Sequence, residues 1–183
     1  MMFTTLLIGF LIASIPRVES AASVFVTKNA ELTLFSEAPM ENIEAVSRNA
    51  YGVVNINSGE IQFGVSIRSF QFRKSLMREH FNENYMESDK YPVAKFKGKL
   101  NMPLEISRDG EYQVTATGDL EVHGVTKRRS VSGTVKVVNG KLEIYSVFDV
   151  KCQDHNIKIP ALVFKNIAET IRITFKGTFS TLT

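Results

Sequence analysis

Hydrophobic and polar residues alternate with a period of two along much of the chain. From Tyr112 to Val122 the even positions carry Tyr, Val, Ala, Gly, Leu and Val, while the odd positions carry Gln, Thr, Thr, Asp and Glu. The same alternation recurs at 94–100 and 171–179. It is typical of strands with one buried face. Further strands are predicted at 24–27, 31–36, 51–57, 61–67, 131–138 and 141–150.

Short polar segments between these predicted strands favour tight turns. The dipeptide Asn139-Gly140 separates the strands at 131–138 and 141–150. Both residues tolerate the positive φ of a type I′ turn, so the pair is a strong hairpin signal. Consecutive strands are therefore expected to be antiparallel neighbours.

Glycines on the apolar phase of the strands help to choose between two all-β architectures. About eight or more strands with one polar face either close into a barrel or stack as a sandwich. Gly98, Gly118, Gly133 and Gly177 stand where a sandwich core would prefer bulky side chains. Interior glycine usually marks a sharp bend at a barrel corner or a close approach to the backbone. The sequence therefore predicts an antiparallel β-barrel, with the sandwich as the alternative.

A helical pattern interrupts the strands between 76 and 92. Met77, Phe81 and Tyr85 are spaced four apart and would form one apolar stripe on a short helix. Pro92 disfavours helical geometry at Tyr91, so the helix should end before it. We expect this segment to lay its aromatic face over one end of the barrel, leaving an apolar interior that is a ligand cavity or a packed core.

The start of the chain has the order of a secretory signal peptide. An apolar run from Leu6 to Ile15 is followed by Pro16, a short polar stretch and two small residues, Ala21 and Ala22. The run is too short to span a bilayer, which requires about 20 apolar residues. We therefore expect residues 1–22 to be removed, after Ser20 or Ala22, and the protein to be exported to the periplasm or secreted. No transmembrane segment is expected in the mature chain.

The remaining residues, 23–183, have the size of one ordinary domain. Cys152 is the only cysteine, so the domain has no intrachain disulfide and depends on its core. The net charge of +3 is spread along the sequence and does not indicate nucleic acid binding. The sequence leaves open whether two copies pair as a homodimer.

Three segments resemble the YceI-like family of exported lipid-binding barrels. They are "GEIQFGVSIRSFQF", "MREHFNENYMESDKYPVAKFKG" and "GDLEVHGVTKRRSVSGTV", and the run from His123 to Lys127 is the most specific piece. The resemblance implies an extended, lipocalin-like antiparallel barrel over 23–183 that holds a long polyisoprenoid chain in its bore. The sequence differs from the common pattern in lacking the usual tryptophan near the start.

Inward positions predict where an apolar chain would bind. Apolar side chains would supply the walls, Phe81 would supply the lid, and the inward glycines would remove volume from the same face. The predicted ligand-binding residues are Phe63, Val65, Phe81, Phe96, Gly98, Val114, Gly118, Gly133, Ile144, Phe148, Phe175, Gly177 and Phe179. The partner is thus a polyisoprenoid or another long-chain lipid, and a barrel with a filled core is the alternative.

Lys127, Arg128 and Arg129 form the densest positive cluster of the sequence. They are candidates to bind a diphosphate or an anionic lipid head group at the mouth of the barrel. The simpler interpretation is a solvated turn, because runs of charge usually face solvent.

Sequence motifs for catalysis are absent, and no catalytic residue, metal site or cofactor is predicted. His80, His123 and His155 lie far apart, with no His-Glu-x-x-His, Cys-x-x-Cys or Gly-x-Ser-x-Gly motif. An enzyme acting on lipophilic substrates would require these histidines to converge in the fold. We interpret His155 as a loop residue and Cys152 as a semi-buried small side chain.

Overall fold

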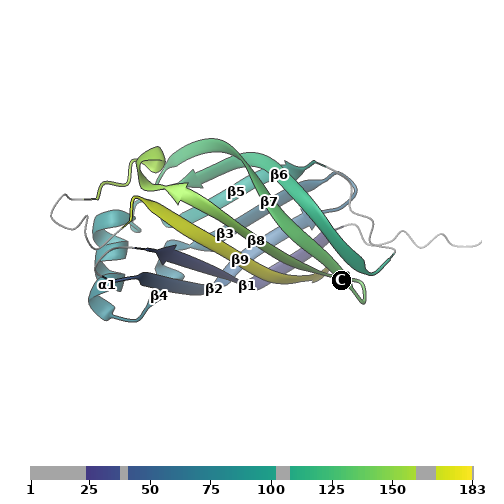
Figure 1. The fold of residues 1–183 in the computed structure, drawn as a ribbon, viewed down its shortest axis with the longest axis horizontal. Coiled ribbons are helices and arrows are strands. Elements are labelled where there is room, and N and C mark those ends of the chain that lie inside the picture. The colour runs from purple at the N-terminus through teal and green to yellow at the C-terminus, as the bar shows by residue number, and fades with distance from the viewer. Residues whose placement is uncertain (1–23, 38–40, 102–107, 160–167, 183) are drawn as a thin grey trace, which may run out of the picture.

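Eight long strands close into an antiparallel barrel in the computed structural model, which describes residues 24–37, 41–101, 108–159 and 168–182 (Figure 1). Their order around the barrel is β1-β9-β8-β7-β6-β5-β3-β2, and β2 pairs with β1 to close it. The strands are β1 (Val24–Ser36), β2 (Ile43–Asn55), β3 (Glu60–Ser66), β5 (Val93–Leu100), β6 (Gly110–Val122), β7 (Val125–Val138), β8 (Lys141–Lys151) and β9 (Thr170–Thr181). The two-residue β4 (Gln71–Phe72) pairs with the start of β2. The predicted barrel is confirmed and the sandwich is excluded.

Three strands are much longer than the sequence pattern predicted, and one of them is β7, which begins at Val125 rather than at Val131. The segments predicted at 24–27 and 31–36 are one strand, β1, whose pairing with β2 shifts register between Thr27 and Leu32. Strand β2 begins at Ile43 rather than at Tyr51. Its inward positions include Ala45 and Ser47, which are buried but small, so the alternation of this stretch is weak on a hydrophobicity scale.

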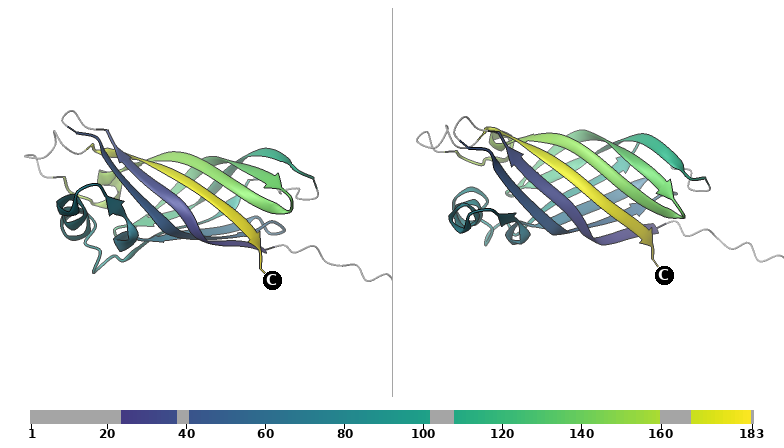
Figure 2. Two further views of the ribbon diagram at one scale, coloured as in Figure 1. Left: turned by 90° about the horizontal axis from the view of Figure 1, so that it is seen from below. Right: turned by 60° about the horizontal axis from the view of Figure 1, so that its bottom comes forward.

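The two ends of the barrel differ in what closes them. One end carries α1 (Ser75–His80), which continues into a π-helical segment, η2 (Phe81–Tyr85). Two 3₁₀ segments, η1 (Ile67–Ser69) and η3 (Cys152–His155), lie at the same end. The carboxyl end of the last strand, β9, reaches the opposite end of the barrel (Figure 2). The predicted helical cap is therefore present.

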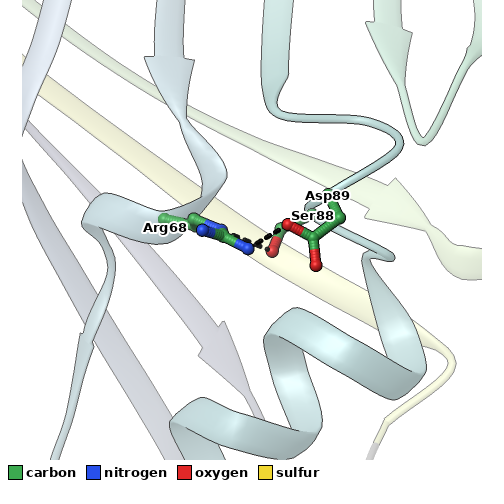
Figure 3. Close-up of polar contacts among 3 residues, drawn as sticks. All are labelled: Arg68, Ser88 and Asp89. Carbon is green, nitrogen blue, oxygen red and sulfur yellow. Dashed lines mark hydrogen bonds and ion pairs between the residues drawn. The ribbon is translucent and has the colours of Figure 1, made fainter.

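Polar contacts fasten the cap to the strands. The Arg68 guanidinium of η1 contacts the Asp89 carboxylate and donates to the Ser88 hydroxyl, joining η1 to the segment after η2 (Figure 3). The Ser69 hydroxyl lies 2.6 Å from that of Ser47 on β2. Exposed ion pairs such as Arg68–Asp89 stabilise a fold only weakly, so their main effect is on the position of the cap.

The end opposite the cap is packed solid. Phe25, Leu142 and Phe179 are at most 1% exposed there. The ring of Phe63 meets those of Phe175 and Phe179 edge to face, with centroids 5.1 and 5.9 Å apart. Such pairs add to the free energy gained by burying the rings. This end of the barrel therefore has a conventional hydrophobic core.

The predicted signal peptide, residues 1–22, lies outside the described residues. Within the ranges that the structure describes, no helix is long and apolar enough to cross a membrane.

Candidate functional site

An apolar cavity of about 440 Å³ lies between the packed end and the cap. The barrel strands form its walls, and Phe70, Phe72, Met77, Phe81 and Met86 close it on the cap side. The Phe81 ring packs between those of Phe70 and Phe72, at centroid distances of 5.7 and 4.9 Å. Cavities of this size and apolar lining are typical of sites for small apolar ligands.

Nine of the thirteen predicted ligand-binding residues line this cavity. They are Phe63, Val65, Phe81, Phe96, Val114, Gly133, Ile144, Phe148 and Phe175. Phe179 is fully buried in the packed end and supports the cavity through its contacts with Phe63 and Phe175. Alternation along the strands was therefore a good guide to the walls.

Gly98 and Gly118 do not line the cavity, which corrects the expectation that they make room for a ligand. They stand directly opposite each other on β5 and β6. A Cβ added to Gly118 would lie 2.4 Å from the carbonyl oxygen of Lys97 and 2.5 Å from the Cα of Gly98. The two glycines therefore allow the two backbones to approach closely at a sharp corner of the barrel.

The other two inward glycines also sit against neighbouring atoms. A Cβ on Gly133 would lie 2.8 Å from the carbonyl oxygen of Tyr145, and one on Gly177 would lie 2.9 Å from the Cβ of Ala30. Gly133 reaches the cavity but Gly177 does not. The cavity thus owes its space to the separation of the walls rather than to missing side chains.

Sequence reasoning missed several lining residues at the ends of strands or outside them. Phe70 precedes the two-residue β4 and Phe72 ends it, Met86 follows η2, and Cys152 opens η3. Phe70 and Phe72 are two residues apart, and Cys152 continues the inward phase of Phe148 and Val150. Each lies at the edge of a strand or outside one, so the sequence alone did not mark them as lining residues.

The three histidines do not form a common site, and two of them hold the cap to the barrel. His155 was interpreted above as a loop residue, but it lies in η3 and is fully buried. Its Nδ1 lies 3.0 Å from the carbonyl oxygen of Val125. His123 lies 3.1 Å from the carbonyl oxygen of His155 through Nδ1. His80 is exposed on α1 and borders the cavity. Among the described residues, no group of three or more His, Cys, Asp or Glu side chains is placed to hold a metal ion.

Cys152 is more deeply buried than expected, at 7% exposure. Burial raises the pKa of its thiol to about 11, because the charged thiolate would lose its hydration. Because the thiolate is the nucleophilic form, this side chain is a poor nucleophile at neutral pH. In the cavity lining it acts as a small apolar group.

The positive cluster lies within strand β7 and not in a turn, which corrects the location given above, although Lys127 and Arg128 are exposed as the simpler interpretation expected. The turn between β6 and β7 consists of His123 and Gly124, both at positive φ. Arg128 forms an ion pair with Asp119, at 3.3 Å. Arg129 donates to the carbonyl oxygen of Asp149 at 2.5 Å, and its guanidinium lies over the Phe148 ring.

Comparison with known proteins agrees with this geometry. The profile of the YceI-like domain matches residues 20–179. The chain belongs to the YceI-like domain family. Comparison with curated protein sequences finds no match. The predicted resemblance to YceI-like proteins is therefore confirmed by the family profile.

Solved structures with the YceI-like fold superpose on the chain. A polyisoprenoid binding domain from Saccharophagus degradans, implicated in plant cell wall breakdown, gives a TM-score of 0.74 at 13% identity, covering 88% of this chain and 99% of that one. BcnA from Burkholderia cenocepacia gives 0.69 at 16% identity, covering 83% and 96%. The YceI protein of Campylobacter jejuni gives 0.56 at 14% identity, covering 100% and 99%. At these identities the likeness shows a shared fold.

Proposed function

We propose that this YceI-like protein is an exported binding protein that holds the apolar chain of a polyisoprenoid-type lipid in its barrel. The observation that carries the proposal is the apolar cavity of about 440 Å³ beneath the helical cap. Each methylene that enters such a site contributes about 0.8 kcal/mol, so a long hydrocarbon chain gains more than a compact ligand. The Saccharophagus degradans domain with this fold is described as polyisoprenoid binding, which supports the same ligand class here.

The competing interpretations have less support. The interpretation as a barrel with a filled core fits only the end around Phe25, Leu142 and Phe179. A lipid-metabolising enzyme requires convergent histidines, but His123 and His155 bond to the backbone and to Glu87. A binding role needs neither feature, because burial of the hydrocarbon chain supplies the affinity.

Native mass spectrometry of the protein purified from its own host, with organic extraction of what co-purifies, tests the proposal. We expect a bound apolar lipid in the wild type and little or none in Ala94→Phe, because Ala94 lines the cavity. Lys97→Phe adds the same bulk to the exposed face of the same strand and should retain the lipid. Wild-type protein that carries no lipid, or an Ala94→Phe variant that keeps it while folded, would contradict the proposal.

A further inference from the structure

The barrel is split along part of one wall. Strands β7 and β8 pair from Val138↔Lys141 to Gly133↔Ser146, and their register ends there. Beyond that point β7 continues to pair with β6 as far as Val125, and β8 continues to pair with β9 as far as Lys151. In Figure 1, β7 arches away from β8 toward the end that carries α1. We call the stretch between residues 125–132 and 147–151 the β7–β8 seam.

Side chains replace the missing backbone pairing at the seam. The Ser146 hydroxyl donates to the carbonyl oxygen of Ser132 at 2.7 Å, where the pairing stops. His155 Nδ1 reaches the carbonyl oxygen of Val125 at the far end. Between these two contacts, Arg129 crosses from β7 to the carbonyl oxygen of Asp149 on β8. Unpaired strand edges are usually covered by other parts of a protein. A seam that only the Arg129 side chain crosses between its two ends is therefore unusual.

The cavity extends to both edges of the seam. Val131 and Ser132 of β7 line it, as do Phe148 and Val150 of β8. The Arg129 guanidinium lies 5.6 Å from the centroid of the Phe148 ring. The seam therefore brings a cationic group into contact with a wall of the apolar cavity.

Two cations occupy the inward phase of β7 at the seam. Lys127 stands opposite Leu120 on β6, and Leu120 is buried and lines the cavity. Directly opposite residues in an antiparallel pair share a face of the sheet, so Lys127 and Arg129 both follow the inward phase of β7. At this end of the strand the Lys127 side chain is exposed and the Arg129 side chain is half-buried. Arg128 lies on the outer phase, opposite Asp119.

The neighbouring carboxylates are engaged elsewhere. Asp119 pairs with Arg128, and the Asp149 carboxylate is 4.0 Å from Arg172. Among the described residues, Arg129 contacts only a carbonyl oxygen and an aromatic ring, and Lys127 pairs with no carboxylate. Within this part of the chain, the seam thus carries two positive charges that pair with no acidic side chain, beside an apolar cavity.

We propose that the β7–β8 seam binds the phosphate head group of an amphiphilic lipid through Lys127 and Arg129 while the hydrocarbon tail fills the cavity. This inference rests on the proposed function. The Arg guanidinium presents paired N–H donors that match phosphate oxygens, and Lys adds a flexible point charge. Arg129 would exchange its carbonyl partner, an uncharged acceptor, for a charged one.

A matched pair of ligands separates the head group from the tail. Geranylgeraniol and geranylgeranyl monophosphate share one chain, and their affinities are measured by competition against a fluorescent apolar probe. The wild type should prefer the phosphate by about tenfold or more, because charge-assisted hydrogen bonds are the strong ones. Lys127→Gln and Arg129→Gln should each weaken binding of the phosphate more than binding of the alcohol, and so reduce this preference. Arg128→Gln, which removes a cation from the outer phase, should keep the preference.

Each alternative result has a distinct meaning. If the alcohol binds and the phosphate binds no better, or if Arg128→Gln acts like Arg129→Gln, the head-group site is wrong and the proposed function stands. If neither ligand binds, the proposed function itself fails. Inorganic phosphate should compete only weakly, and equal competition would identify a site for free phosphate instead. If Arg129→Gln lowers the melting temperature, Lys127→Gln still tests the head-group site, because Lys127 makes no hydrogen bond or ion pair with β8 among the described residues.

Discussion

His123 Nε2 lies 2.7 Å from a carboxylate oxygen of Glu87, and this contact joins the β6–β7 turn to the end of the helical cap. The other ring nitrogen faces the carbonyl oxygen of His155. Both ring nitrogens thus face a hydrogen-bonding oxygen. The Tyr91 ring packs on the imidazole with centroids 4.6 Å apart. The segment around His123 is therefore a structural joint.

Replacing His123 by alanine should lower the free energy of unfolding by about 1–3 kcal/mol, because it leaves hydrogen-bonding partners unpaired. Urea denaturation monitored by circular dichroism measures the change. His80→Ala is the control, since His80 is exposed on α1 and should change stability by less than about 0.5 kcal/mol. Equal losses of unfolding free energy in His123→Ala and His80→Ala would contradict a structural role for the contacts of His123.

Replacing Phe81 by alanine should cost about 2 kcal/mol. The ring is half-buried between Phe70 and Phe72, so the loss should fall below the range of about 3–5 kcal/mol for fully buried aromatic residues. Leu76→Ala, on the 58% exposed side chain of the same cap, should have little effect. A negligible loss at Phe81 would show that the cap is not packed against the barrel.

Replacing Gly118 by alanine should destabilise the fold by about 3 kcal/mol, at the upper end of the range for overpacking. The added Cβ would collide with backbone atoms of Lys97 and Gly98, which cannot move without opening the β5–β6 corner. Gly110→Ala on the same strand is the control, because its nearest contact would be an ordinary 3.4 Å. A Gly118→Ala variant with wild-type stability would contradict the close approach of the two strands.

Alkylation of Cys152 by iodoacetamide should be slow at pH 8 and accelerate as the pH approaches the thiol pKa of about 11. The folded-state pKa is raised, so the thiol's contribution to stability is complete below its ordinary pKa of 9.0 and is lost as the pH rises toward about 11. The unfolding free energy of the wild type relative to Cys152→Ala should therefore be constant below pH 9.0 and fall as the pH rises toward about 11. Rapid alkylation of the native protein at pH 8 would show that the thiol is exposed.

The exported form should lack residues 1–22, which the described residues do not include. Amino-terminal sequencing of protein recovered outside the cytoplasm should begin after Ser20 or Ala22. A sequence that begins at Met1 in such material would exclude the predicted cleavage.

The sequence predicted the barrel and part of the cavity walls because each strand has one buried face, and a period of two follows from that. The helix spacing of Met77, Phe81 and Tyr85 likewise predicted the cap. The role of Gly118 was misread because the contact that requires glycine involves a neighbouring strand, and its register is not visible in one sequence. The break between β7 and β8 was unpredictable for the same reason.

The split in the barrel wall also bears on how far the bore can adapt. In a fully paired barrel, widening the bore breaks a ladder of backbone hydrogen bonds along a strand. At the capped end of this barrel, Ser146 and Arg129 join β7 to β8 and His155 joins β7 to η3, among the described residues. At that end, the ring of strands is therefore not closed by backbone hydrogen bonds between β7 and β8. Under the proposed function, a thicker chain would enter by breaking these side-chain contacts alone, while the strand pairing at the packed end stays intact.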